Sequence, residues 1–191
     1  SKLALALSIV NGDISASAAI AWSKIATSGA VVNADVSSSA AITPDKLSGP
    51  LFSYYRNSSS NNVTGNGTVY TCLFDTAVIS NANYNTSTGI FTAPAAGKYL
   101  FVGKVGVASG SSGGTQGEVN VVTTGRSYRH DGNPYGNRHI ASGVMSIPFA
   151  IIASMAQNDT AKVTLTVTGD GSDIADFIGG AFSDFAGWRV G

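Results

Sequence analysis

The chain has 191 residues, of which 43% are hydrophobic and only 12% are charged, and its eleven basic residues equal its eleven acidic residues. This length and hydrophobic content suit one compact domain with a further segment. The balanced charge lacks the basic excess that proteins binding nucleic acid or anionic membranes usually carry, so we expect neither partner. No stretch approaches the ~20 apolar residues of a membrane span, so we expect no membrane insertion.

Residues 1–49 contain an internal repeat. The segment IVNGDISASAAIAWSKI, from Ile9, aligns with VVNADVSSSAAITPDKL, from Val31, so that Ile20 falls on Ile42 with a period of 22 residues. Each unit has too little apolar surface to fold alone. We therefore predict an extended, repetitive fibrous stalk whose aliphatic residues meet around an axis shared by identical chains. A flexible Ala/Ser linker is the alternative, although a linker has no reason to keep this register.

From residue 50 to residue 191 the sequence changes to short apolar runs separated by clusters of Gly, Asn, Ser and Asp. This pattern is typical of strands and turns. The fold class that we predict is all-β, a jelly-roll β-sandwich head of about ten antiparallel strands. The strands are expected at 51–56, 68–77, 82–84, 90–93, 98–108, 118–124, 145–155, 162–168 and 185–190.

Within two of these strands, the stretches 98–107 and 146–152 carry apolar residues on both faces, whereas 162–168 alternates Val and Leu with Lys and Thr. An alternating strand has one face in water, but a strand that is apolar on both faces must be covered on both sides. In a sandwich with few long loops, another copy of the same chain can supply the second cover. The residues that we expect between subunits are Leu100, Val102, Ile147, Phe149 and Ile151.

The segment GIFTAPAAGKYLF contains Phe91, Pro94, Gly97, Tyr99 and Phe101 in the order F-x-x-P-x-x-G-x-Y-x-F. This order resembles the hallmark of the globular head of complement component one-q and its relatives, which are trimeric jelly rolls similar to tumour necrosis factor. Further positions are similar to that family: Phe74, Tyr84, Asn85, Gly89, Phe185, Gly187 and Trp188. The resemblance covers about residues 51–191. It implies a homotrimer in which Tyr99 and Phe101 fill the core while Leu100 and Val102 face the threefold contact.

The N-terminal repeat, with its shared N-x-D-[IV]-S-x-S-A-A-I, resembles segments of bacteriophage tails and fibres that precede such heads. Animal relatives of the head usually carry a collagen stalk of Gly-X-Y triplets, which this sequence lacks. The combination favours a viral or bacterial protein over a secreted animal one.

The sequence gives little support to catalysis or metal binding. His130 precedes Asp131, but adjacent strand or loop residues point apart, so we expect no catalytic residue there. Glycoside cleavage normally uses two facing carboxylates, and Glu118 is the single Glu. Asp170, Asp173 and Asp176 lack the spacing of a calcium loop, so we expect neither a metal nor a cofactor. We interpret Cys72 as a buried apolar residue.

One segment, RSYRHDGNPYGNRHIASG, concentrates Arg, His and Tyr residues in what we predict to be a loop. Aromatic faces stack on sugars, and Arg pairs with carboxylates or phosphates, so this composition suits recognition of a cell-surface glycan or protein. Packing between neighbouring subunits is the alternative. The candidate receptor-binding residues are Arg126, Tyr128, Arg129, His130, Asn133, Tyr135, Arg138 and His139.

We interpret the chain as a homotrimeric, non-enzymatic fibre protein of a virus particle, most simply a phage tail fibre. Its stalk would join other virion proteins, and its head would contact the host cell surface from outside the cell. The alternatives are a virion decoration or capping protein whose head only trimerises the fibre, a polysaccharide-degrading tailspike, and a secreted lectin or signalling ligand.

Overall fold

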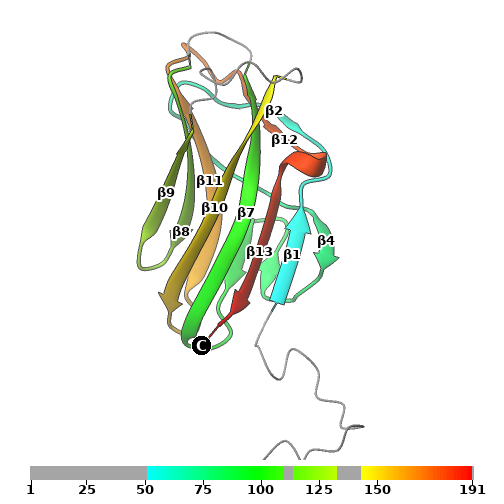
Figure 1. Ribbon diagram of the computed structural model, residues 1–191, viewed down its shortest axis with the longest axis vertical. Helices are drawn as coiled ribbons and strands as arrows, with labels where there is room; N and C mark the ends of the chain where they lie inside the picture. The colour runs from blue at the N-terminus through cyan, green and yellow to red at the C-terminus, as the bar shows by residue number, and fades with distance from the viewer. Residues whose placement is uncertain (1–50, 110–113, 133–142, 191) are drawn as a thin grey trace, which may run out of the picture. The chain divides into compact units, whose positions relative to one another are not determined.

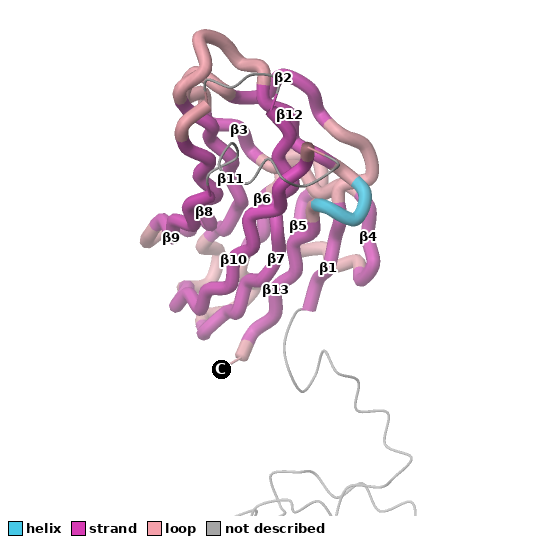
Figure 2. Tube along the Cα trace, turned by 45° about the horizontal axis from the view of Figure 1, so that its top comes forward, coloured by secondary structure: helices cyan, strands magenta, loops and turns pink. Residues whose placement is uncertain are grey.

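The computed structural model describes residues 51–109, 114–132 and 143–190, and within them it shows an all-β head of two packed antiparallel sheets (Figure 1). The predicted fold class is confirmed. The stalk expected at residues 1–49 lies outside the described residues. Strands and loops make up nearly all of the described trace (Figure 2), and the helical element within it is one 3-10 turn, η4 (Gly180–Phe182).

Sheet A has the strand order β2-β12-β7-β13-β1-β4, with β10 added beside β7. The long strand β7 is central, because β10 pairs with nearly its whole length while β13 and β12 share its other edge. The strands of sheet A are β1 (Leu51–Tyr55), β2 (Ser60–Thr64), β4 (Thr76–Ile79), β7 (Gly97–Ser109), β10 (Val144–Met155), β12 (Ala175–Ile178) and β13 (Asp184–Arg189).

Sheet B has the strand order β5-β6-β11-β8-β9, with β3 beside β6 on the same edge of β11. Its strands are β3 (Val69–Thr71), β5 (Tyr84–Asn85), β6 (Ile90–Thr92), β8 (Gln116–Thr123), β9 (Ser127–Gly132) and β11 (Thr160–Thr168). In β11 the side chains of Val163, Leu165 and Val167 are fully buried, as the alternation of the sequence predicts.

The inner faces of the two sheets meet in one core that is rich in aromatic rings. Phe52 lies among them, with ring centroids 5.0 Å from those of Phe91 and Phe185. Such pairs contribute about 0.5–1.5 kcal/mol beyond the area they bury. Tyr99 and Phe101 are fully buried in the same core, as predicted.

The Pro94–Gly97 hinge carries the chain from one sheet to the other. The strand β6 before it pairs in sheet B, whereas β7 after it lies in sheet A. The hydroxyl of Tyr99 donates to the carbonyl of Ala95 at 2.7 Å, which ties the start of β7 to the hinge. Crossing between the sheets here lets β6 and β7 supply aromatic residues to the core from opposite sides.

The turn before this hinge depends on Asn85 and Gly89. Asn85 Oδ1 accepts a hydrogen bond from the Ser87 N–H at 2.9 Å, as in an Asx turn. Gly89 has φ of 69°, and a Cβ added there would lie 2.7 Å from the carbonyl oxygen of Cys72. Glycine is therefore required at this position both for its backbone conformation and for space.

The structure differs from the predicted strands in three ways. The strand expected at 68–77 is divided into β3 in sheet B and β4 in sheet A, because the chain crosses between the sheets. Strands β2 and β12 were not predicted, and they pair with each other at the edge of sheet A. Part of the segment predicted to be a receptor loop is instead strand β9, which pairs with β8 over Ser127–Gly132.

Candidate functional site

The outer face of sheet A is largely apolar. One row of directly paired residues crosses four strands, and it consists of Leu51, Trp188, Leu100 and Ile152. Paired residues of antiparallel strands project on the same side of the sheet. The next row carries Ile79, Ser53, Ala186, Val102 and Ala150. We call the apolar residues of these two rows the apolar face.

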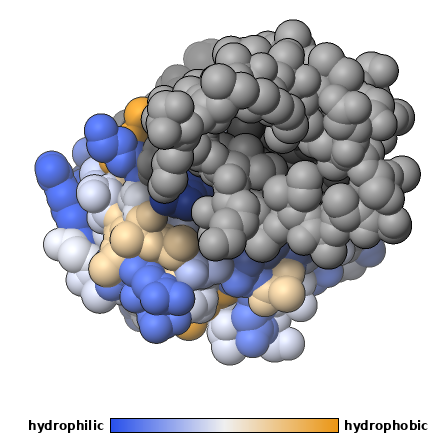
Figure 3. Space-filling view, turned by 90° about the horizontal axis from the view of Figure 1, so that it is seen from below, coloured by the Kyte–Doolittle hydropathy of each residue, from blue (hydrophilic) through white to orange (hydrophobic). Residues whose placement is uncertain are grey.

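Part of this face is open to solvent in a single chain. Ile152 is 59% exposed and Leu51 36% exposed, whereas Leu100, Val102 and Trp188 are partly covered. A Lys104–Asp184 ion pair, 3.6 Å between Nζ and Oδ2, marks the polar boundary of the face. At the end of the head where β1 begins and β13 ends, hydrophobic and hydrophilic residues lie side by side on the surface in view (Figure 3).

The residues expected between subunits lie on two different faces. Leu100 and Val102 project outward from β7 into the apolar face, as the alternation with Tyr99 and Phe101 predicts. Ile147, Phe149 and Ile151 project inward from β10 and are 3%, 4% and 9% exposed, so the chain covers them with its own core. The outward side of β10 instead carries Ser146, Pro148, Ala150, Ile152 and Ser154.

The outer face of sheet B at strands β8 and β9 is polar. Gln116, Glu118 and Asn120 project outward from β8, and Ser127, Arg129 and Asp131 project outward from β9; we call these six residues the polar face. Arg129 is one of the receptor residues predicted from sequence, and Asp131 follows the predicted receptor residue His130. The three β8 residues were not predicted to bind a receptor. Their alternation with buried Gly117, Val119 and Val121 is the signal that could have revealed them.

Arg129 is held between two carboxylates of the polar face. Its Nε donates to Asp131 Oδ1 at 2.6 Å, and its Nη1 lies 3.0 Å from Glu118 Oε2. Gln116 Nε2 also donates to Asp131 Oδ1, at 3.3 Å, and Asn120 Nδ2 donates to Glu118 Oε1. The hydrogen bond from Arg129 lowers the pKa of Asp131, and the same bond raises the pKa of Arg129. Both groups are therefore charged at neutral pH.

Of the other candidates that the structure describes, Tyr128 and His130 project to the opposite side of β9 from Arg129. The Arg126 guanidinium lies 5.1 Å from the ring centre of Tyr128, close enough for a cation–π contact. His130 projects to the other side of β9 from Asp131, and its ring centroid is 6.2 Å from that of Phe149 at the core. These two neighbours thus point apart, as predicted. Four candidates lie outside the described residues: Asn133, Tyr135, Arg138 and His139.

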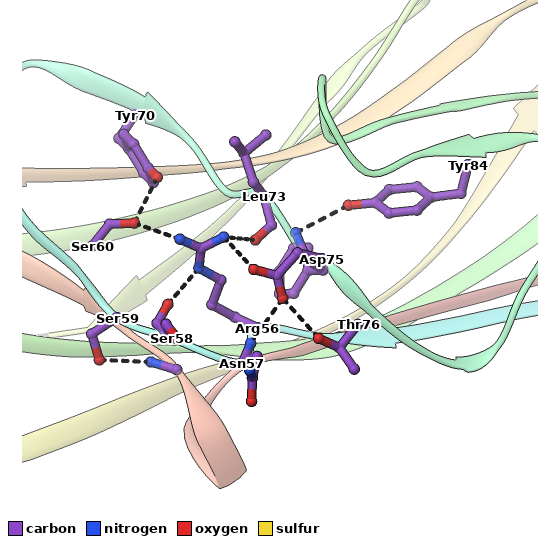
Figure 4. A network of polar contacts seen from close by, with 12 residues as sticks. Arg56, Asn57, Ser58, Ser59, Ser60, Tyr70, Leu73, Asp75, Thr76 and Tyr84 are labelled. Atoms are coloured by element: carbon purple, nitrogen blue, oxygen red, sulfur yellow. Dashed lines mark hydrogen bonds and ion pairs between the residues drawn. The ribbon is translucent and has the colours of Figure 1, made fainter.

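A second polar network ties the β1–β2 loop to the β3–β4 loop (Figure 4). Arg56 Nη1 lies 2.6 Å from Asp75 Oδ2, its Nη2 donates to Ser60 Oγ at 3.0 Å, and the Asn57 N–H donates to Asp75 Oδ1 at 2.9 Å. Burial raises the pKa of Asp75, but hydrogen bonds from Asn57 and Thr76 and the charge of Arg56 bring this pKa below its usual value. These internal contacts hold two loops together, so the network is structural.

The acidic turn residues and the cysteine that the sequence analysis considered do not form a common site within the described residues. Asp173 and Asp176 accept hydrogen bonds from the backbone N–H groups of Asn66 and Asn62, at 3.5 and 2.8 Å. Within the described ranges, no three His, Cys, Asp or Glu side chains are grouped as metal ligands. Cys72 is buried, as predicted, and burial raises the pKa of its thiol. In the part of the chain that the structure covers, no helix has the length and apolar character to cross a membrane.

Comparison with known proteins identifies the fold. No protein family matches this sequence, and neither does any curated protein. Among solved structures, the globular domain of zebrafish complement 1qA protein is similar over 74% of this chain and 98% of that domain, with a TM-score of 0.51 and 15% identity. The head has the complement one-q jelly-roll fold.

Two further structures are similar to this complement one-q-like head, each with a TM-score of 0.49. Murine APRIL is 11% identical, over 73% of this chain and 98% of its own. Eiger TNF from S. frugiperda is 10% identical, over 74% of this chain and 92% of its own. The likeness predicted from the hallmark residues is confirmed for the fold by the zebrafish domain, whose TM-score is above 0.5.

Proposed function

We propose that this chain is a non-enzymatic fibre protein of a virus particle, most simply a phage tail fibre. Its complement one-q-like head forms a homotrimer and contacts the host cell surface from outside the cell. The repetitive segment of residues 1–49 is the stalk that joins the head to other virion proteins. The likeness of the repeat to phage fibre segments supports the viral assignment.

The apolar face is the observation that carries this proposal. Its exposed Ile152 and Leu51 lie in one row with Leu100 and Trp188, and an apolar surface of this kind favours association with another protein. Another copy of the chain is the occupant that we assign. Residues 1–49 directly precede the head in the sequence, so chains that share a stalk would bring their heads close enough for the apolar faces to meet.

The polar face is the surface that we assign to the host. It belongs to the other sheet, so association through the apolar face leaves it open for a partner. Asp131 is poorly suited to be the general acid of glycoside cleavage, because a general acid needs a raised pKa and the hydrogen bond from Arg129 lowers the pKa of Asp131. This point favours binding over a polysaccharide-degrading tailspike.

Attachment of the purified full-length chain to a panel of bacterial cells tests the function, and light scattering of the same sample tests the trimer. We expect a trimer that attaches to some strains and not to others. A trimer that attaches to none of them would favour the decoration or capping protein. A monomer would contradict the proposed assembly.

A further inference from the structure

We propose that the polar face binds an uncharged carbohydrate, through hydroxyl groups that bridge Asp131 and Arg129. This inference rests on the proposed function and names the class of receptor for it. It departs from what the sequence composition suggests, because three Arg residues close together would favour an anionic ligand. The reason lies in how Arg129 is already paired.

The guanidinium of Arg129 is not available as an isolated positive charge. Its Nε and Nη1 are both directed at carboxylates, those of Asp131 and Glu118. The six residues of the polar face therefore carry two negative charges and one positive charge. A carboxylate or sulfate of an acidic sugar would lie beside Glu118 and Asp131 as well as Arg129, and repulsion from these two carboxylates would offset much of its attraction to the guanidinium. An uncharged hydroxyl meets no such repulsion.

The same pairing leaves hydrogen-bonding groups that match neighbouring sugar hydroxyls. Asp131 uses Oδ1 for both Arg129 and Gln116, and no described residue bonds to its Oδ2. Likewise, Nη2 of Arg129 has no partner among the described residues. A carboxylate oxygen accepts and a guanidinium nitrogen donates, so a pair of adjacent hydroxyls can satisfy both groups at once. Because Glu118 and Gln116 hold these side chains in place, less conformational entropy is lost on binding.

The surface is hollowed beside these groups. An open hollow of about 450 Å³ is lined by Thr115, Gln116, Asp131 and Gly132, where β8 begins and β9 ends. The hollow is shallow and largely open to solvent, so a sugar there would be held mainly by its hydrogen bonds to Asp131 and Arg129.

A glycan array probed with the full-length chain tests the inference, using immobilised neutral oligosaccharides beside sialylated and sulfated ones. Asp131→Asn and Arg129→Gln should each weaken binding to the neutral glycans by about tenfold or more, because each removes a charged hydrogen-bonding partner. Lys162→Gln is the matched control, since Lys162 is a cation on the outer face of the same sheet, paired opposite Val122 rather than within the polar face. Light scattering and thermal melting should show that all three variants stay folded and associated.

Attachment to the bacterial panel, with and without periodate treatment of the cells, separates the two proposals. Periodate oxidises neighbouring hydroxyl-bearing carbons to aldehydes and breaks the carbon–carbon bond between them, so it destroys adjacent hydroxyl pairs and we expect it to abolish attachment. Cell attachment that resists periodate, without glycan binding, would overturn the carbohydrate proposal and leave the fibre function standing. Preference for the acidic glycans, or unchanged binding by Asp131→Asn, would also overturn it. If the chain binds neither cells nor glycans, the receptor role itself is overturned.

Discussion

Replacing Ile152 with Asp should dissociate the trimer. Ile152 lies on the outward side of β10 and is 59% exposed in one chain. Full burial of an aliphatic side chain contributes about 1.5–3 kcal/mol. Covering the exposed 59% of Ile152 should therefore contribute about 1–2 kcal/mol per subunit. Three copies would contribute about 3–5 kcal/mol, and an unpaired carboxylate in the contact would add a desolvation penalty of several kcal/mol per subunit.

Light scattering at micromolar concentration measures this change, and circular dichroism shows whether the variant stays folded. We expect Ile152→Asp to be monomeric with the β-rich spectrum of the parent. Val69→Asp is the matched control, because Val69 is 64% exposed but lies on the outer side of sheet B. It should remain trimeric. A trimeric Ile152→Asp variant, or equal dissociation of both variants, would refute the assignment of the contact to the apolar face.

Three further changes test the fold and the separate roles of the head and the repeat. Asp75→Asn should lower the free energy of unfolding by about 0.5–1 kcal/mol at pH 7, measured by urea unfolding. Because the pKa of Asp75 is lowered in the fold, this contribution is present above about pH 4 and is lost as the pH falls further. Equal losses of stability at pH 7 and pH 2 would contradict it. Gly187→Ala should lower the melting temperature by overpacking that costs about 1–3 kcal/mol, because its Cβ would lie 2.6 Å from the Phe101 ring, while Gly171→Ala, with open space around it, should not. Deleting residues 1–49 should leave a folded trimeric head, and failure of that head to assemble would place trimerisation in the repeat.

The core of the head could be predicted from sequence because its strands carry clear signals. In β7 the alternation of Tyr99 and Phe101 with Leu100 and Val102 fixes which side chains face inward. In β11 the same alternation separates the core from the outer face. Both strands are central in their sheets, so hydrophobic burial determines their pattern.

Edge strands could not be predicted in the same way. The segment SNNVT of β2 is polar and has no apolar period, because it lies at the edge of sheet A and pairs only with β12. The segment SYRHDG of β9 directs only Tyr128, His130 and Gly132 inward. A strand at an edge has fewer neighbours to cover it, so its sequence reads like a loop.

The face assigned to Ile147, Phe149 and Ile151 could not be decided from β10 alone. Both sides of that strand carry apolar residues, and only the pairing of Ile151 with Phe101 shows which side belongs to the core. A shift of one residue exchanges the two faces of a strand. The polar face was likewise hidden, because Glu118 meets Arg129 and Asp131 only through the pairing of β8 with β9.

Sedimentation equilibrium of the full-length chain at low micromolar concentration tests self-association through the apolar face most directly. The mass of one chain is 19.4 kDa, and we predict a single species of three times this mass. Conversion of that species to the monomer by Ile152→Asp would locate the contact. A parent chain that sediments as a monomer would contradict the trimer, and with it the proposal that the head is the end of a fibre.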